Sequence, residues 1–506
     1  MDKIRIASNP VVSKILDITD DLKLEISELL SYQVAGAEHS MSFKNGSWTG
    51  RSTLFSYEKA VYPTGLTPLV ISFLKKKGYE VSLIRSPAPV PLGITMPEID
   101  DFGYTEEYAY QYKTVDQLVK YRSMIARVAT GGGKSRIGCL AFARIKRPTL
   151  FITTRSVLMY QMKEAFEKTI AYRKAAGEKD LEDVFCGTLG DSEWRLSKHL
   201  NVAMVQTIQA RLKNPETADK MRKILEHFEF VILEEAHESS GEGYYQVMNA
   251  CKNAHYRLSL TGTPFMREDE EANMRLMAVS GAIGIRVSEL ELIEKGILAT
   301  PEFKILKSMP DPKVKKSSNW QLAYKYGITH NAKRNEAIVA EAMSAVQHGL
   351  SVMILVQRRE HGKTLYDMLE KKAKVKYIFG DSDRATRKKA LEDLRSGDIQ
   401  ILIGSTILDV GVDVPAVGMV INAGAGKAEV ALRQRIGRGL RRKAPGTVNK
   451  VYVVDFEDKI NKHLVTHSEQ RRQILLSTPG FAENILDPDK DFSFKSDRIA
   501  LASKSD

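Results

Sequence analysis

The chain has 506 residues and a formal net charge of +12, with 43% hydrophobic and 27% charged residues. This composition excludes a disordered or fibrous protein, and no apolar run approaches the ~20 residues that span a bilayer, so we expect a globular, cytoplasmic protein of roughly three domains. The positive charge favours nucleic acid over a membrane as partner, because no basic amphipathic helix or lipidation signal accompanies it.

Residues 1–98 predict a small α+β domain. Asn45-Gly46 is a hairpin signal, with Ser52–Tyr57 as the returning strand. A helix over Thr67–Lys77, closed by Gly78, precedes a strand over Tyr79–Ile84. Prolines at four positions from 87 to 97 then predict a stiff, extended linker, so we place the domain boundary there.

Trp48 is a candidate nucleic-acid contact in this first domain. Its indole ring can stack on a base, and Lys44 and Arg51 nearby can pair with phosphates. An equally simple interpretation is that Trp48 packs under its own hairpin. The sequence leaves both interpretations open.

From about Tyr104 onward, short β-rich runs alternate with helical segments, which predicts two consecutive parallel sheets covered by helices on both faces. Pro310–Trp320 is the expected mobile connection between the two sheets. Three widely spaced cysteines form neither a zinc pattern nor a disulfide framework and predict ordinary buried thiols. The predicted strands are residues 149–153, 202–205, 230–233, 257–260, 351–356, 375–378, 399–403, 417–421 and 450–454.

Residues 128–135, Val-Ala-Thr-Gly-Gly-Gly-Lys-Ser, predict a phosphate loop. Three glycines allow the backbone N–H groups to converge on one anion, and a helix expected from Arg136 adds the positive end of its dipole. Lys134 would reach the β- and γ-phosphates of ATP, and Ser135 would hold Mg²⁺. A glycine-rich turn with an incidental lysine is the simpler alternative. The loop residues expected to bind the nucleotide are Thr130, Gly131, Gly132, Gly133, Lys134 and Ser135.

Glu234 and Glu235 follow the predicted strand over 230–233, at the carboxyl end where ligands of such sheets bind. Next to a phosphate loop, one carboxylate can hold Mg²⁺ through water while the other polarises the attacking water. We assign the metal role to Glu234 and the catalytic role to Glu235. Without the phosphate loop, the pair would be read as a solvated acidic strand end.

An ordered series of motifs resembles the superfamily 2 helicases. The resemblance implies two RecA-like domains with ATP in the cleft between them, preceded here by the small α+β domain. The motifs are ATGGGKS at 129–135, TTR at 153–155, QT at 206–207, EEAH at 234–237, TGTP at 261–264, ILDVGVD at 407–413 and QRIGRGLR at 434–441.

The resemblance implies a role for further residues. Arg438 and Arg441 resemble arginine fingers, whose planar guanidinium groups suit the γ-phosphate oxygens. Gln434 and Asp413 resemble groups that sense nucleotide, and Gln111 resembles an adenine contact. His237 and Thr263 resemble residues that couple hydrolysis to domain movement. The family usually has aspartate where this chain has Glu234, and Mg²⁺ demands near-ideal octahedral geometry. The implied DNA contacts are Thr154, Arg155, Gln206, Thr207, Gln357, Arg358 and Thr406.

The first domain also resembles one branch of this superfamily, the phage UvsW helicases, through residues 43–51, 62–66 and 76–79. This resemblance implies ATP-driven unwinding, branch migration and fork regression on branched DNA, with little sequence preference. Phage recombination or single-strand-binding proteins would be partners, and the host cytoplasm the location; a monomer is compatible with the sequence. We expect a DNA-binding N-terminal domain over 1–98, an ATP-binding RecA-like lobe over 99–305, a second lobe over 306–475 and a polar tail over 476–506.

Three alternatives remain open at the level of sequence. An RNA helicase would share the core motifs. A restriction-type duplex translocase would need a nuclease or methylase partner. A DNA-binding scaffold would result if Glu234 had silenced ATP turnover.

Overall fold

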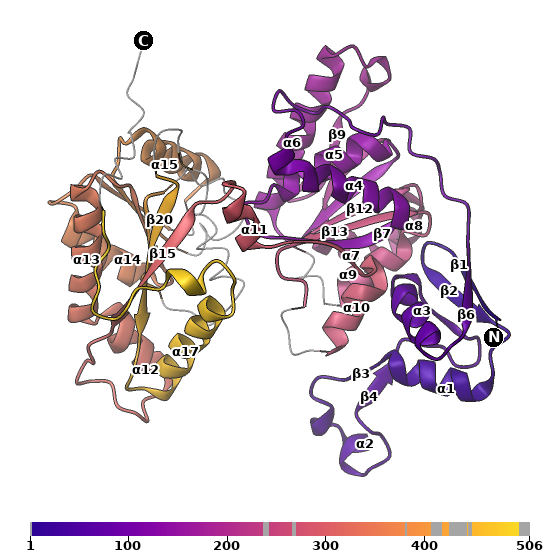
Figure 1. Cartoon of the computed structure of the whole chain (residues 1–506), viewed down its shortest axis with the longest axis horizontal. Helices are drawn as coiled ribbons and strands as arrows, with labels where there is room; N and C mark the ends of the chain where they lie inside the picture. The colour runs from indigo at the N-terminus through magenta and orange to yellow at the C-terminus, as the bar shows by residue number, and fades with distance from the viewer. Residues whose placement is uncertain are drawn as a thin grey trace. The chain divides into compact units, whose positions relative to one another are not determined.

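The computed structural model describes residues 3–235, 242–265, 270–379, 382–405, 417–424, 443 and 448–494. The chain divides into two compact units, residues 1–128 with 133–286 and residues 129–132 with 287–506 (Figure 1). Within the described ranges, no helix is long and apolar enough to cross a membrane.

The N-terminal module, residues 3–85, is a four-stranded sheet of order β5-β2-β1-β6 packed against helices. Strand β1 pairs antiparallel with β2 and parallel with β6. The predicted helix and strand are confirmed as α3 and β6, and Gly78 after α3 has φ +88°, which a glycine adopts at low cost. Its elements are β1 (Lys3–Ser8), β2 (Val12–Leu16), α1 (Asp20–Leu29), β3 (Ser31–Gln33), α2 (Met41–Lys44), β4 (Arg51–Thr53), β5 (Val61–Pro63), α3 (Thr67–Lys76) and β6 (Glu80–Arg85).

The predicted hairpin at Asn45-Gly46 is wrong. These residues end the short helix α2, where Asn45 N donates to Met41 O at 3.0 Å and Gly46 takes φ +74°. Asn-Gly suits a left-handed helix end as well as a hairpin turn, and Ser40 caps the start of this helix by accepting from Phe43 N. Strand β4 instead pairs antiparallel with β3, more than ten residues upstream of α2's end.

The N-terminal module and the first large sheet belong to one unit and share a close-packed joint. A Cβ atom at Gly65 would lie 2.1 Å from the Met277 carbonyl oxygen, so only glycine allows this approach. Ala278 belongs to the same apolar cluster as Leu66 of the module. The proline-rich segment over 87–97 forms neither helix nor strand and is held by hydrogen bonds such as Gly93 N to Arg144 O at 3.1 Å.

The first large sheet has the strand order β10-β9-β11-β8-β12-β13-β7-β14, and β7, β8, β11, β12 and β13 pair in parallel. In β8, Leu150 and Ile152 join the core on one face, whereas Phe151 packs against Phe166 of α6 on the other. All four strands predicted here are confirmed. The elements are α4 (Ala109–Tyr121), β7 (Ser123–Val128), α5 (Lys134–Ile145), β8 (Thr149–Thr153), α6 (Ser156–Ala175), β9 (Cys186–Gly190), β10 (Glu193–Arg195), β11 (Leu200–Met204), α7 (Val205–Lys213), α8 (Pro215–Glu226), β12 (Phe230–Glu234), α9 (Glu242–Ala250), β13 (Tyr256–Thr261), α10 (Glu270–Ser280) and β14 (Ile283–Val287).

The second large sheet has the order β15-β20-β19-β16-β18-β17, and its neighbouring strands pair in parallel. Helices α13 and α14 contribute to its buried core. Its five predicted strands are confirmed. The elements are α11 (Glu289–Glu294), β15 (Thr300–Lys307), α12 (Trp320–Tyr324), the π-helix η6 (Lys325–Thr329), α13 (Ala332–Gln347), β16 (Val352–Val356), α14 (Arg359–Leu369), β17 (Val375–Ile378), α15 (Arg384–Ser396), β18 (Ile401–Ser405), β19 (Met419–Asn422), β20 (Lys450–Glu457) and α17 (Lys462–Leu476).

The prediction that Pro310–Trp320 is a mobile connection between the two sheets is wrong, both in its position and in its mobility. Strand β15 already belongs to the second sheet, so the chain enters that sheet before residue 310. The loop over 313–318 is anchored instead: Val314 is buried, and Asn461 Nδ2 donates to the carbonyl oxygens of Lys315 at 3.0 Å and Ser318 at 2.9 Å.

The segment expected to be a polar tail packs on the second sheet as far as residue 494. Phe481 and Phe492 are buried, and Leu486 N donates to Phe303 O at 2.8 Å. The three cysteines are buried free thiols, as predicted. Burial raises the pKa of Cys139 and that of Cys251 to about 12, so neither is a reactive thiolate.

Candidate functional site

The phosphate loop follows β7 and leads directly into α5, which begins at Lys134, two residues earlier than predicted. Gly131 and Gly133 take φ +86° and +76°, and Gly132 N donates to Ala129 O at 3.0 Å. These left-handed turns curl the loop around the helix start, where free N–H groups and the helix dipole favour an anion. Lys134 Nζ donates to Val128 O at 3.3 Å, and Ser135 is exposed at the helix start.

Glu234 ends β12 and is buried, whereas Glu235 is partly exposed and has φ +48°. Burial and, to a smaller extent, the neighbouring Glu235 raise the pKa of the Glu234 carboxyl to about 8, and Lys134 opposes the shift. The opposing effect of Lys134 shows that the strand end and the phosphate loop lie within electrostatic reach of each other. A buried carboxyl with this environment becomes an anion most readily when a cation approaches it.

The donor set of this strand end fits Mg²⁺ better than a protein-enclosed metal. Within the described ranges, no group of three or more His, Cys, Asp or Glu side chains is placed to hold a metal ion. Mg²⁺ is usually held by one or two protein oxygen ligands, with waters and substrate phosphates completing its shell. The Glu234 carboxyl and the Ser135 hydroxyl are oxygen donors of that kind, and they stand beside a phosphate loop.

Gln111 lies on α4 and is buried, with its side chain against Gly133, whose added Cβ would come within 2.4 Å of Gln111 Nε2. Its Oε1 accepts from Arg136 Nη1 at 2.7 Å. Arg136 also forms a two-pronged pair with Asp100, at 2.9 and 3.0 Å. Arg136 and Asp100 therefore hold Gln111 against the loop. The sequence missed this positioning pair, because nothing in the pattern relates two residues 36 positions apart.

Of the remaining residues expected at the nucleotide, some lie within the described ranges and others lie outside them. Thr263 is buried just after β13, and its N–H donates to Thr261 Oγ1 at 3.2 Å. His237, Asp413, Gln434, Arg438 and Arg441 lie outside the described ranges, and so does the expected DNA contact Thr406.

The structure brings together the four DNA-contact candidates of the first sheet. Strands β8 and β11 are parallel neighbours, so the residues that follow them meet at one edge. Gln206 Nε2 donates to Thr154 O at 3.0 Å, which links the two segments directly. Arg155 and Gln206 are exposed there, and Thr207 is half-buried on α7 beside Gln206.

In the second unit, Gln357 and Arg358 follow β16 and are organised by Tyr324 of α12. The Tyr324 hydroxyl lies 3.3 Å from Gln357 Oε1, and the Arg358 guanidinium lies over the tyrosine ring at 5.5 Å. The ring of His467 in α17 lies against the ring of Trp320 in the same region, at 4.6 Å between centroids and tilted by 59°.

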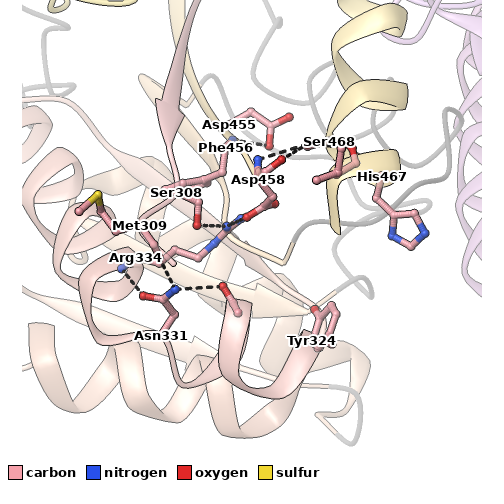
Figure 2. A network of polar contacts seen from close by, with 12 residues as sticks. Ser308, Met309, Tyr324, Asn331, Arg334, Asp455, Phe456, Asp458, His467 and Ser468 are labelled. Carbon is pink, nitrogen blue, oxygen red and sulfur yellow. Dashed lines mark hydrogen bonds and ion pairs between the residues drawn. The ribbon is translucent and has the colours of Figure 1, made fainter. Parts of the chain in front are cut away.

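A buried polar network lies beside this region (Figure 2). Arg334 of α13 donates to Asp458 Oδ1 at 2.9 Å and to Ser308 Oγ at 3.2 Å. Asn331 caps the start of α13 and donates to the Met309 carbonyl oxygen at 2.8 Å. These contacts tie the ends of β15 and β20 to the helix before β16.

In the N-terminal module, Lys44, Trp48 and Arg51 are not joined by a hairpin. The Trp48 indole N–H donates to Arg51 O at 2.7 Å, and the Trp48 side chain is half-buried. The Arg51 guanidinium contacts Ser31 and lies 3.5 Å from Glu270. Lys44 is exposed at the end of α2.

Family models match three consecutive parts of the chain. The model described as DNA helicase UvsW, N-terminal, matches residues 5–84. The model described as type III restriction enzyme, res subunit, matches residues 105–266, and the helicase conserved C-terminal domain matches residues 333–443.

Similar proteins agree with these matches. The chain is 23% identical over 459 residues to the ATP-dependent DNA helicase uvsW of Enterobacteria phage T4, covering 86% of this chain and 87% of that protein. It is 24% identical over 370 residues to the DNA 3'-5' translocase XPB2 of Sulfurisphaera tokodaii, covering 66% of this chain and 78% of the other.

Among solved structures, a fragment described as an HsdR subunit of a type I restriction enzyme from Vibrio vulnificus matches with a TM-score of 0.54 at 14% identity, covering 87% of this chain and 74% of that one. That likeness shows the fold: two RecA-like domains after a small α+β domain. From the order of the three family models and the likeness to its relatives, the chain is an ATP-dependent DNA helicase of superfamily 2 that resembles the phage UvsW helicases.

Proposed function

We propose that this helicase uses ATP and Mg²⁺ to unwind and remodel branched DNA, by branch migration of Holliday junctions, fork regression and displacement-loop unwinding, in phage recombination, repair and replication. The observation that carries the proposal is the match of the UvsW N-terminal model to residues 5–84, directly ahead of the helicase core. The close-packed joint at Gly65 fixes this module to the first sheet, which supports a role of the module in the helicase activity of the core.

We assign the chemistry to the residues at the phosphate loop. Lys134 and the loop N–H groups bind the β- and γ-phosphates, and Gln111 contacts the adenine. Ser135 and Glu234 would hold Mg²⁺, which supplies charge neutralisation at the phosphates. Glu235 accepts the proton of the attacking water. Arg438, Arg441, Gln434, Asp413 and His237 complete the assignment from the family pattern.

DNA contacts are assigned to the edge residues of both sheets, and their supply of hydroxyl, amide and guanidinium groups favours phosphates over bases. The domain boundaries expected at 98, 305 and 475 stay a proposal, with the second one moved ahead of Thr300 because β15 pairs within the second sheet. We propose a cytoplasmic protein in the host cell, with phage recombination or single-strand-binding proteins as partners.

The test is a panel of fork, junction, linear duplex, single-stranded DNA and RNA substrates, each assayed with and without ATP. Branched DNA should be unwound fastest and should stimulate ATP hydrolysis most. A preference for RNA would instead favour an RNA helicase, and equal activity on linear duplex would favour a restriction-type translocase. An ATPase rate equal to that of Lys134→Ala would identify a scaffold and contradict the enzymatic proposal.

A further inference from the structure

A small basic recess lies at the joint between the N-terminal module and the first large sheet. We define it by Ser8 and Arg85 at the carboxyl ends of β1 and β6, Ser86, Arg122 just before β7, and His255 just before β13. The phosphate loop and Glu234 lie at the opposite, carboxyl ends of β7 and β12. The basic recess is therefore separate from the proposed ATP site.

The basic recess collects positive charge without an acidic partner. Among the residues that the structure describes, three arginines and one histidine line it, and no aspartate or glutamate does. Arg85 is exposed, and its side chain forms no hydrogen bond or ion pair within the described part of the chain. Arg122 uses Nη1 to donate to Ser86 O at 2.8 Å, which leaves its other N–H groups for a ligand.

The third arginine, Arg257, is a structural neighbour of the basic recess. It is buried and donates to the carbonyl oxygens of Met248 at 3.2 Å and Cys251 at 3.0 Å. Its charge nevertheless acts on the recess, because with burial and with Arg122 it lowers the pKa of His255. Burial and Arg122 also lower the pKa of Arg85, and no carboxylate opposes either shift. Like charges held together in this way are stabilised by an anion.

The size of the basic recess limits the anion. Its volume is about 90 Å³, well below the ~300–1,000 Å³ of pockets that enclose a drug-sized ligand. A space of this size suits a single phosphate group better than a whole nucleotide. The joint around the basic recess is tightly packed. Gly65 also lines the recess, and it packs directly against the Met277 carbonyl.

We propose that the basic recess binds one phosphate group of the DNA backbone, with Arg85 and Arg122 contacting its oxygen atoms. Guanidinium groups match the oxygens of a phosphate with parallel N–H donors. Such a contact positions a duplex arm without reading its sequence. Since the recess joins the module to the first sheet, the bound arm is held by both. The inference rests on the proposed function in taking DNA as the substrate.

The first test measures how the affinity for a forked duplex depends on salt, by fluorescence anisotropy. Loss of one phosphate contact lowers the slope of log K against log salt by about one. We expect this reduction for Arg85→Gln, and a smaller one for Arg85→Lys, which keeps the charge. The matched control, Lys75→Gln, removes an exposed positive charge from α3 of the same module and should keep the wild-type slope. Equal slopes for Arg85→Gln and wild type would overturn the proposal.

The second test places a carboxylate in the basic recess with Ser86→Asp. This side chain should raise the melting temperature of the DNA-free protein, because it relieves the repulsion between Arg85 and Arg122, and should weaken binding of the fork. A purely structural role of the recess predicts that both quantities fall, or that DNA binding stays unchanged, and either result counts against the proposal.

Inorganic phosphate distinguishes the two sources of the anion. Phosphate can stabilise the wild type but not Arg85→Gln while the salt dependence of DNA binding is the same for both proteins. In that case the recess binds free phosphate, and the DNA assignment is wrong. If the wild type neither hydrolyses ATP nor binds forks, the proposed function itself fails. If the wild type hydrolyses ATP and binds forks, but Arg85→Gln has the same salt slope as the wild type, only the proposal for the basic recess is refuted.

Discussion

Two consecutive glutamates lie at the carboxyl end of β12, one inside the strand and one just after it, and their backbone conformations differ. Glu234 completes the strand, whereas Glu235 has φ +48°. A left-handed conformation costs a residue with a side chain on the order of 1–3 kcal/mol, and such strain gathers at functional sites. The departure from the strand at Glu235 gives the two carboxyl groups different environments, one buried and one partly exposed, as their proposed roles require.

We expect Glu235→Gln to lower ATP turnover by about 10²- to 10⁴-fold, the usual contribution of a general base, while nucleotide binding persists. Steady-state hydrolysis and binding of a fluorescent ATP analogue would measure the two effects. Glu229→Gln is the matched control, because Glu229 immediately precedes the same strand at its other end. Turnover of Glu235→Gln near that of Glu229→Gln would rule out the catalytic role.

His361 predicts how stability depends on pH. Its Nε2 atom lies 2.9 Å from Asn335 Oδ1, and burial, followed by the charges of Arg334 and His330, lowers the pKa of His361 to about 3. An unfolded histidine titrates near ~6.5, so between these values the unfolded chain binds more protons. The free energy of unfolding should therefore fall as pH decreases from ~6.5 toward 3, by up to about 1.4 kcal/mol per pH unit.

Urea denaturation at neutral and mildly acidic pH would measure this dependence. His361→Gln should be less stable at neutral pH but should lose less stability on acidification. His348→Gln, a change at an exposed histidine, should keep the wild-type response. If acidification affects His361→Gln and wild type equally, the histidine is not the group that titrates.

At the scale of elements, the regular strands could be predicted because buried parallel strands are continuous apolar runs, as in Phe230–Leu233. Strand β15 was missed: Pro301 is its second residue, and a proline weakens a strand prediction, yet β15 is an edge strand where proline is tolerated. Asn45-Gly46 misled because two different turns use the same residues. In the candidate site, Lys134 and Glu234 were visible as motifs, but the Arg136–Asp100 pair depends on tertiary contact alone.

Asn461 connects two elements, and its two side-chain atoms can be tested separately. Its Nδ2 atom holds the loop over 313–318, and its Oδ1 atom accepts from His463 N at 3.0 Å at the start of α17. Asn461→Asp keeps the cap acceptor and loses the donor, whereas Asn461→Ala loses both. We expect faster hydrogen exchange in the loop for both variants, and a loss of about 1–3 kcal/mol in the free energy of unfolding for Asn461→Ala. Unchanged loop exchange would show that Asn461 does not anchor it.

At the scale of the whole molecule, the net charge of +12 attracts the proposed substrate, because DNA is a polyanion. The N-terminal module contributes Trp48, which is half-buried and keeps its indole N–H bonded within the module. Trp48 is therefore bonded within the module without being fully buried, and activity measurements must decide between the two interpretations of its role.

We expect Trp48→Ala to reduce junction unwinding by about tenfold or more, the scale of a lost base-stacking contact, and to leave DNA-independent ATP hydrolysis largely unchanged. Trp48→Phe keeps an aromatic face but loses the bond to Arg51 O, so it should retain most of the unwinding. Parallel unwinding and ATPase assays would separate the effects. An equal loss of both activities in Trp48→Ala would identify Trp48 as a core residue.

The shared apolar cluster around Leu66 and Ala278 has a consequence for how this protein can be divided. Because α10 contributes Ala278 to the core of the N-terminal module and Leu276 and Val279 to the core of the first large sheet, the two should melt in a single cooperative transition. A helicase core truncated ahead of Tyr104 would expose the face of α10 that Gly65 now covers and would be prone to aggregate. For this helicase, the smallest autonomous ATP-binding fragment therefore includes the front of the chain.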